Sequence, residues 1–481
     1  MIVKSILLLL LHIIIVVVFA LFIESPDLVD LSFQKKCIGL YFFALFIYFY
    51  LIKDELKNNI LSFNVILMFG YFIVFFQVVV LQHLGFYLPT WSYNKYWANS
   101  TIENDAVAIS VLAITLYMLG NLYIKKISKK EIKTKISHAN FDNIAFLNLL
   151  TYVSYILFFI TSGSYRSGVY YAGDALAVSG YFYKFFNASL TASIIIKLTF
   201  VFNSFERISL KKYVSSFGLP LALILSWHLL FSLYVGDRGV IISYGLLLSS
   251  VYIYKFRSIR IHELVILVVS ASIVMTVIGQ VRQSKDYLLQ LETTLSGDSN
   301  PSRWYSEKVP GDSFIELAHS GRTLNHSLYN VPMHYDFRNG VYAFKRIIGV
   351  IPGAQGIANN LIDNNEKKYE STSEFISFLI QGDNPTYGDG TSITADIYLD
   401  FGLSGIFIGM FLFGCFMGKS ESLIYAHKVY FLSFTWVAFL VYFSKSLYLS
   451  RASIFLELSG IVLVWLFIWF NFLIYKSFPK K

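Results

Sequence analysis

Apolar runs separated by short polar loops extend over most of this 481-residue chain. An α-helix needs about 20 apolar residues to cross a hydrocarbon core of about 30 Å. By this measure the pattern predicts twelve membrane-spanning helices, at residues 4–23, 37–52, 60–85, 106–124, 144–161, 185–203, 214–235, 239–254, 263–281, 392–418, 428–448 and 453–475. The sequence therefore predicts an all-α polytopic membrane protein with about 12 transmembrane helices and one large loop between helices 9 and 10.

Composition and the distribution of charge support this interpretation. Hydrophobic residues make up 56% of the chain and charged residues 14%, whereas a soluble domain has about 25% charged residues. Twenty Lys and Arg lie in the termini and in one alternating set of loops, and eight lie in the short loops of the other set. Because positive residues in short loops favour the cytoplasm, we expect both termini inside and residues 282–391 outside. The Lys-rich run 125–135 is then interpreted as an anchor attracted to anionic lipids, and no nucleic-acid partner is expected.

This pattern divides the chain into three parts. Residues 1–281 carry transmembrane helices 1–9, residues 282–391 form the outward loop, and residues 392–481 carry helices 10–12. Within the loop, Ser313–Tyr329 and Val341–Ile348 have the spacing of short amphipathic helices. We expect the loop to form a folded platform on the membrane rather than a separate domain.

An excess of arginine on the outward side suggests an anionic ligand there. Arg238 lies in Gly236-Asp237-Arg238-Gly239, a break between two apolar runs, and its planar guanidinium could bind a phosphate with two hydrogen bonds. An anchor at the membrane interface, paired with Asp237, is the alternative for this residue. Arg282, at the end of the ninth span, could equally be an ordinary snorkelling residue. A single arginine would not indicate a ligand, but six on the predicted outward side of a protein with few charges do. These are Arg238, Arg282, Arg322, Arg338, Arg346 and Arg451.

Candidates for acid–base chemistry lie in two places. A helix over residues 316–327 would place Glu316, His319, Arg322 or Thr323, and His326 on one polar face, so that a carboxylate or an imidazole could act as a general base. Asp396 and Asp400 are one helical turn apart at the start of the tenth span; they could be partners of the helix dipole or acids that face a cavity. The spacing of His319 and His326 matches no known metal site, so no metal and no cofactor are expected.

Taken together, these features resemble the Wzy family of O-antigen (oligosaccharide repeat unit) polymerases. The resemblance rests on about twelve spans, the large loop, the Gly-Asp-Arg-Gly hairpin and the arginine at the end of the span before the loop. Further matches are Phe337-Arg-Asn-Gly340 and the block from Gly388 to Gly405, Gly-x-Gly-Thr-Ser-Ile-Thr-Ala-Asp-Ile-Tyr-Leu-Asp-Phe-Gly-x-x-Gly. Asp396 stands where the family commonly has Glu, and Asp400 stands where it commonly has Asn.

The resemblance implies a GT-C-like glycosyltransferase in the bacterial inner membrane, active in lipopolysaccharide biosynthesis with its large loop in the periplasm. It implies that the non-reducing sugar of a new repeat unit attacks the anomeric carbon of the growing chain, and undecaprenyl diphosphate leaves. The other implied partner is a chain-length regulator of the polysaccharide co-polymerase type. For the leaving diphosphate, which needs cations, the candidates are Arg238, Arg282, Arg322, Arg338 and Arg346. The base candidates are Asp396, Glu316 and His326; accessory candidates are Asp237, His319, Asp400 and Arg451.

Two other functions are compatible with such a chain. An O-antigen ligase also has about twelve spans and a large periplasmic loop, but the block around Asp396 favours the polymerase. A polysaccharide flippase or another transporter would predict inverted repeats and broken helices at the membrane midplane, and the two halves of the sequence show no such correspondence.

Overall fold

The computed structural model describes residues 2–86, 96–131, 141–168, 175–176, 178–260, 262–266, 269–270, 312–351, 354, 356, 360, 371–425 and 429–477, without the side chains of residues 2, 58, 126–131, 312, 313, 316 and 425. All regular elements in these ranges are helical. Six of the described helices are long and apolar enough to cross a membrane, or seven if one bent pair counts as a single span. An all-α membrane protein is therefore confirmed, while the number of twelve spans and the arrangement of the large loop stay predictions.

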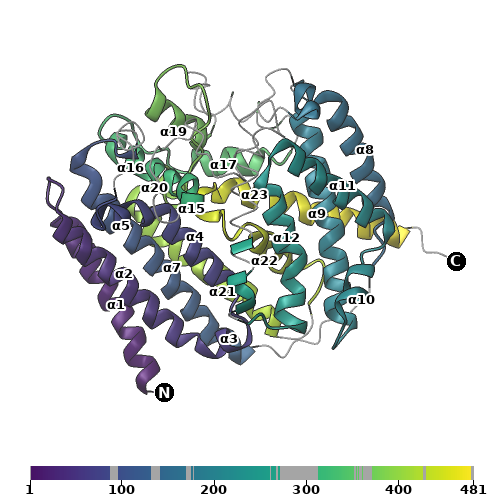
Figure 1. Ribbon diagram of the computed structural model, residues 1–481, viewed down its shortest axis with the longest axis horizontal. Helices are drawn as coiled ribbons and strands as arrows, with labels where there is room; N and C mark the ends of the chain where they lie inside the picture. The colour runs from purple at the N-terminus through teal and green to yellow at the C-terminus, as the bar shows by residue number, and fades with distance from the viewer. Residues whose placement is uncertain are drawn as a thin grey trace, which may run out of the picture. The chain divides into compact units, whose positions relative to one another are not determined.

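The chain divides into two compact units. The first unit comprises Met1–Ile132, Arg303–Ser422 and Ser446–Ser459. Its elements are α1 (Ile2–Ile23), α2 (Leu31–Leu51), α3 (Lys53–Asn58), α4 (Phe63–Phe75), α5 (Gln77–His83), η1 (Ser100–Ile102), α7 (Glu103–Glu131), α15 (Asp312–Ala318), η4 (His319–Gly321), α16 (Arg322–Asn330), α17 (Val341–Ile348), α19 (Thr372–Gln381), α20 (Ile393–Gly405), η6 (Ile406–Met410), α21 (Phe411–Tyr425) and η7 (Leu449–Arg451). Helices α1, α2 and α7 lie side by side, in purple and blue in Figure 1.

The second unit comprises Lys133–Ser302, Leu423–Lys445 and Gly460–Lys481. Its described elements are α8 (Ala145–Thr161), η2 (Gly163–Ser167), α9 (Ser179–Ser204), α10 (Leu210–Ser215), α11 (Leu219–Val235), α12 (Arg238–Val251), η3 (Tyr252–Phe256), α22 (Phe434–Lys445) and the greater part of α23 (Ile454–Ser477). Helices α8 and α9 make the most extensive contact here, and the indole of Trp436 on α22 donates to Thr199 on α9 at 2.9 Å. The predicted span 263–281 lies mostly outside the described residues.

Glycines hold α7 and α21 in backbone contact. A Cβ atom on Gly120 would lie 2.1 Å from the carbonyl oxygen of Phe411, and one on Gly414 would lie 2.1 Å from that of Tyr117. Small residues are used in this way where membrane helices approach closely, because lipid provides no hydrophobic force between helices. This contact fixes α21, and the segment that precedes it, against the N-terminal helices of the first unit.

A buried ion cluster lies in the same unit. The ammonium of Lys125 on α7 contacts one oxygen of Glu55 and one of Glu421, each at 2.6 Å. Asn64 on α4 donates to Glu421 at 2.8 Å and accepts from the hydroxyl of Tyr117 at 2.6 Å. Buried charges are tolerated when they are paired and hydrogen-bonded. The prediction that Lys125 is attracted to anionic lipids was therefore wrong, because its ammonium is buried between two carboxylates of the protein.

The described part of residues 282–391, called the polar segment below, folds onto helices of the first unit. Helix α15 contacts α4 and α5, and α16 contacts α7, α19 and α20. Helices α4 and α5 meet at a bend of 56°, and Gly321 fits at this place: a Cβ on it would lie 2.4 Å from the carbonyl oxygen of Val74. Short helices are present at both places where the sequence predicts them, over Asp312–Asn330 in three pieces and over Val341–Ile348.

We expect Gly414→Ala to destabilise the protein, because its methyl group would meet a backbone oxygen that cannot move aside. Overpacking of this kind costs about 1–3 kcal/mol. The matched control is Gly460→Ala, in a helix where nothing lies within 4 Å of the added Cβ and where Ala is the better helix former. The measurement is the thermal midpoint of the purified protein in detergent, and equal midpoints for the two variants would contradict this account of the contact.

Candidate functional site

The start of α20 carries a completely buried carboxylate. Ser392 caps the helix by accepting from the amide of Ala395 at 3.3 Å, which places Asp396 in the first turn. The Oδ1 atom of Asp396 accepts from the hydroxyls of Thr372 and Thr391. Its Oδ2 atom is buried and accepts no hydrogen bond within the described part of the chain. This carboxylate is therefore held by hydrogen bonds to Oδ1, and it also interacts with the hydroxyl of Ser453, while Oδ2 is enclosed by the protein.

One turn further along α20, Asp400 has a different environment. Its two oxygens accept from the backbone amides of Tyr342 and Ala343, at 3.1 and 2.9 Å. The preceding turn, Phe337–Gly340, lies against the same helix, since the amide of Arg338 donates to the carbonyl of Leu399 at 3.0 Å. Asp400 thus connects α20 to the first turn of α17.

The turn Phe337–Gly340 and the break in α20 fit together. Gly402 has a φ of 63° inside α20, so the helix is interrupted there, and a Cβ on Gly402 would lie 3.1 Å from the ring of Phe337. Gly340, with a φ of 90°, lies equally close to the ring of Phe401. The two motifs of the sequence resemblance, residues 337–340 and 388–405, are therefore in direct contact.

Helix α17 brings cations to this region. The positive charge of Arg346 interacts electrostatically with Asp396, and the guanidinium Nε of Arg346 is buried without a hydrogen bond to a described residue. The guanidinium of Arg338 lies over the rings of Tyr342 and Phe375, at 5.9 and 5.7 Å from their centres. Lys345 is also buried on this helix, although no pattern in the sequence distinguishes it from the other lysines. The site therefore combines an acidic group on α20 with basic groups on and beside α17.

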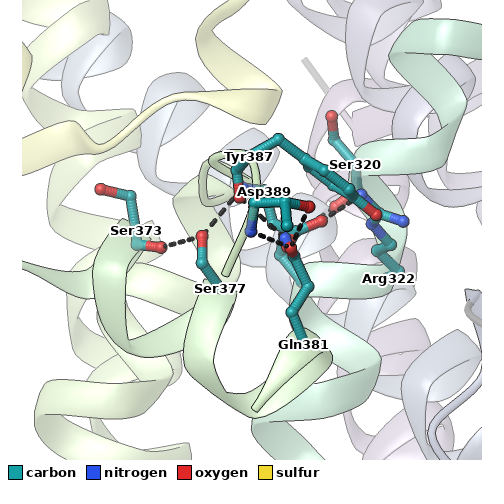
Figure 2. Close-up of polar contacts among 9 residues, drawn as sticks. Ser320, Arg322, Ser373, Ser377, Gln381, Tyr387 and Asp389 are labelled. Atoms are coloured by element: carbon teal, nitrogen blue, oxygen red, sulfur yellow. Dashed lines mark hydrogen bonds and ion pairs between the residues drawn. The ribbon is translucent and has the colours of Figure 1, made fainter. Parts of the chain in front are cut away.

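Arg322 lies in a separate network, drawn in Figure 2, that connects α16 to α19 and the turn before α20. Its guanidinium forms a buried ion pair with Asp389. Asp389 also accepts from Gln381, and its amide donates to the hydroxyl of Ser377 at 2.9 Å. Sequence reasoning did not select Asp389, although it lies in the Gly/Asp turn that precedes the motif at Asp396. The ion pair gives Arg322 a position and a partner within the protein itself.

Of the polar face predicted over residues 316–327, only part is described. Glu316 lies in α15, and its side chain is outside the described structure. His326, on α16, is half-buried. Burial, and then the neighbouring charge of Arg322, lower the pKa of His319 to about 3. The imidazole of His319 is therefore neutral at pH 7, and a group with so low a pKa is a weak general base there.

The remaining predicted residues lie elsewhere or are not described. Arg238 is the first residue of α12, in the second unit, where Asp237 caps the helix by accepting from the amide of Gly239 at 3.1 Å. Arg451 lies in η7, which contacts α20 in the first unit. Arg282 lies outside the described residues. Within the described ranges, no group of three or more His, Cys, Asp or Glu side chains could hold a metal ion.

Fold and site together define a multi-pass helical membrane protein in which a buried carboxylate interacts electrostatically with an arginine, where a polar segment meets a broken membrane helix. The family model described as O-antigen polysaccharide polymerase Wzy matches residues 1–481. The chain belongs to this family, as its motifs had indicated. It is therefore a polymerase of the glycosyltransferase type, in a family that acts on lipid-linked oligosaccharide repeat units in membranes. No curated protein and no solved structure matches the chain.

The low pKa of His319 predicts a pH-dependent stability. The unfolded imidazole gains a proton below about pH 6.5, while the folded one stays neutral until about pH 3. The unfolded state therefore binds more protons in this window, and stability falls by roughly 1 kcal/mol per pH unit as the pH decreases from 6.5 toward 5. Thermal midpoints of wild type and His319→Gln, measured between pH 5 and 8, should converge at low pH. The exposed His334 gives the control, His334→Gln, and a wild-type pH slope in His319→Gln would refute the assignment.

We further expect the pair of Arg322 and Asp389 to be essential to the fold of the polar segment. Removing one partner leaves a buried charge unpaired, which costs about 3–5 kcal/mol. Arg322→Met and Asp389→Leu should each lower the thermal midpoint strongly, and the double variant should lose less than the sum of the two. Arg257→Ala removes an exposed ion pair with Glu263 and serves as control. Additive losses in the double variant would show that the two side chains do not depend on each other.

Proposed function

We propose that this protein joins undecaprenyl-diphosphate-linked repeat units into O-antigen at the periplasmic face of the inner membrane. The growing chain would be transferred onto the non-reducing end of a new repeat unit. Membership of the Wzy family supports polymerisation. The observation that carries the proposed mechanism is the environment of Asp396, a buried carboxylate with one oxygen without a hydrogen bond in the described structure and with Arg346 nearby.

In the proposed reaction, a hydroxyl of the acceptor sugar attacks the anomeric carbon of the growing chain. A new C–O bond forms at this carbon as its bond to the diphosphate oxygen breaks. The hydroxyl proton passes to the Oδ2 atom of Asp396, and the electron pair of the broken bond leaves with undecaprenyl diphosphate. In this scheme Arg346 would stabilise the negative charge that develops on the leaving diphosphate, because fixed cations in a site of low dielectric constant stabilise such charge more than water does.

The hydrogen bonds of Asp396 suit it to this role. Thr372 and Thr391 both donate to Oδ1, and the hydroxyl of Ser453 also interacts with the carboxylate, so three hydroxyl groups fix its position. Because the residue is completely buried, the acceptor hydroxyl reaches Oδ2 only when the groups that cover it are displaced. A buried base of this kind would act on a substrate that has already left water.

Other cations can share the diphosphate with Arg346. Arg338 lies on the turn that contacts α20, and Arg451 lies on an element that contacts the same helix. We assign to Arg322 a supporting role through Asp389. Arg238 and Arg282 remain proposed diphosphate ligands on the basis of the sequence, as Glu316 and His326 remain alternative bases. A chain-length regulator of the co-polymerase type is the proposed protein partner.

Transfer of the finished glycan to lipid A core, the reaction of a ligase, would use similar chemistry, but the family match favours the polymerase. The lipopolysaccharide of a deletion strain separates these functions on one gel. Loss of a polymerase leaves core with a single repeat unit, whereas loss of a ligase or flippase leaves bare core. Bare core in the deletion strain would overturn the proposed function.

Complementation of that strain tests the site. We expect Asp396→Asn to give no long chains because amide substitution removes the proton acceptor, and Arg346→Ala to reduce chain growth by at least tenfold, as is typical when a group that stabilises developing charge is removed. Asp336→Asn and Arg207→Ala, at exposed positions, are the matched controls and should restore the ladder. The protein level of each variant is measured in the same membranes. A full ladder from Asp396→Asn at normal protein level would exclude Asp396 as the base.

A further inference from the structure

Helix α17 is held against α20 by a carboxylate that does not belong to its own segment. Its N-cap residue, Gly340, has no side chain to accept hydrogen bonds from the first turn. The second and third residues of the helix, Tyr342 and Ala343, donate their amides to Asp400 instead. These are the two positions from which an N-cap side chain normally accepts. Asp400 therefore performs the function of the missing cap from a helix 58 residues further along the chain.

Such a cap matters more for α17 than for a long helix. An isolated helix shorter than about 12 residues is marginal in water, and α17 has 8 residues. A negative charge near the helix N-terminus also interacts favourably with the helix dipole. The position of α17 thus depends on its attachment to α20, and the two hydrogen bonds to Asp400 are the polar part of that attachment.

The same attachment determines where Arg346 lies. From Asp400, one turn back along α20 leads to Asp396, and one turn forward along α17 from Tyr342 leads to Arg346. An electrostatic interaction links Arg346 to Asp396, and each of these residues lies one helical turn from the hydrogen bonds that join α17 to Asp400. A shift or unwinding of the first turn of α17 would move the guanidinium of Arg346 relative to the Oδ2 atom of Asp396.

The geometry also separates the roles of the two carboxylates. Both oxygens of Asp400 accept hydrogen bonds from backbone amides. In Asp396, by contrast, threonine hydroxyls donate to Oδ1. A carboxylate that is engaged through both oxygens is poorly suited to take a proton from a substrate. Asp400 was an accessory candidate on sequence grounds, and its contacts indicate that it acts through α17.

We propose that Asp400 is a positioning residue, which caps α17 from α20 and thereby holds Arg346 beside Asp396 for the transfer step. This inference rests on the proposed function for the part that concerns catalysis. The capping itself can be tested without any activity.

The first experiment measures hydrogen exchange of the backbone amides in α17, by mass spectrometry of the full-length protein in lipid nanodiscs. Asparagine at position 400 keeps one acceptor and turns an N–H group toward the second amide. We therefore expect Asp400→Asn to increase exchange in residues 341–348, while Asp336→Asn leaves it unchanged. Unchanged exchange in Asp400→Asn would overturn the capping role, whatever the activity of the protein.

The second experiment is a double-mutant cycle on chain growth, with purified protein in nanodiscs and lipid-linked repeat units isolated from the polymerase deletion strain. Misplacement of a group by about 1 Å can cost up to 100-fold in rate, so we expect Asp400→Asn to lower kcat by about tenfold or more with a smaller change in KM. In the Arg346→Ala background the same substitution should have little further effect. Thermal midpoints of all variants identify any loss of folded protein.

The outcomes of this cycle are distinct. Equal losses from Asp400→Asn with and without Arg346 would show that Asp400 does not act through that residue, and would overturn the catalytic part of the inference. Wild-type kcat in both Arg346→Ala and Asp396→Asn would instead refute the proposed site. In that case the exchange experiment alone still decides whether Asp400 caps α17.

Discussion

Two carboxylates one turn apart on α20 organise the polar site of this protein. Asp400 uses both oxygens to cap α17, and Asp396 uses one oxygen to bind threonine hydroxyls from α19 and from the turn before α20. Burying two such groups close together is costly unless their charges are met by hydrogen bonds and cations. The arrangement of α17, α19 and the turn at Gly390 around α20 meets this requirement. The polar segment is therefore fixed by the same groups that the proposed reaction uses.

A rigid support lies behind this site. The helix that carries the two carboxylates continues through the break at Gly402 into η6 and α21, which contacts α7 through glycine. Because the α7 and α21 backbones touch, there is little freedom for α21 to slide. The break at Gly402 in turn gives the ring of Phe337 a place against the helix. The site thus combines a fixed membrane helix with short helices whose positions depend on a few polar contacts.

Much of this architecture can be predicted from the sequence because it depends on local patterns. Apolar runs predict the membrane helices, amphipathic spacing predicts α16 and α17, and the block from Gly388 to Gly405 identifies the helix that carries the site. The partners of charged groups cannot be found in this way. Arg322 is 67 residues from Asp389, and Lys125 is 70 residues from Glu55, so neither pairing leaves a local signal. The sequence already favours Asp396 over Asp400 as the base, but only the contacts show that Asp400 is engaged through both oxygens by the first turn of α17.

The cluster at Lys125 has a consequence for how the chain is made. Glu55 and Lys125 are synthesised early, whereas Glu421 follows Lys125 by nearly 300 residues. Asn64, which donates to the same carboxylate, precedes it by 357 residues. During synthesis the early helices therefore hold a lysine with one of its two final counter-ions. Their native packing is completed only when α21 is inserted. The ion cluster of the first unit is thus completed late in synthesis. A fragment that ends before the polar segment lacks Glu421 and cannot form it.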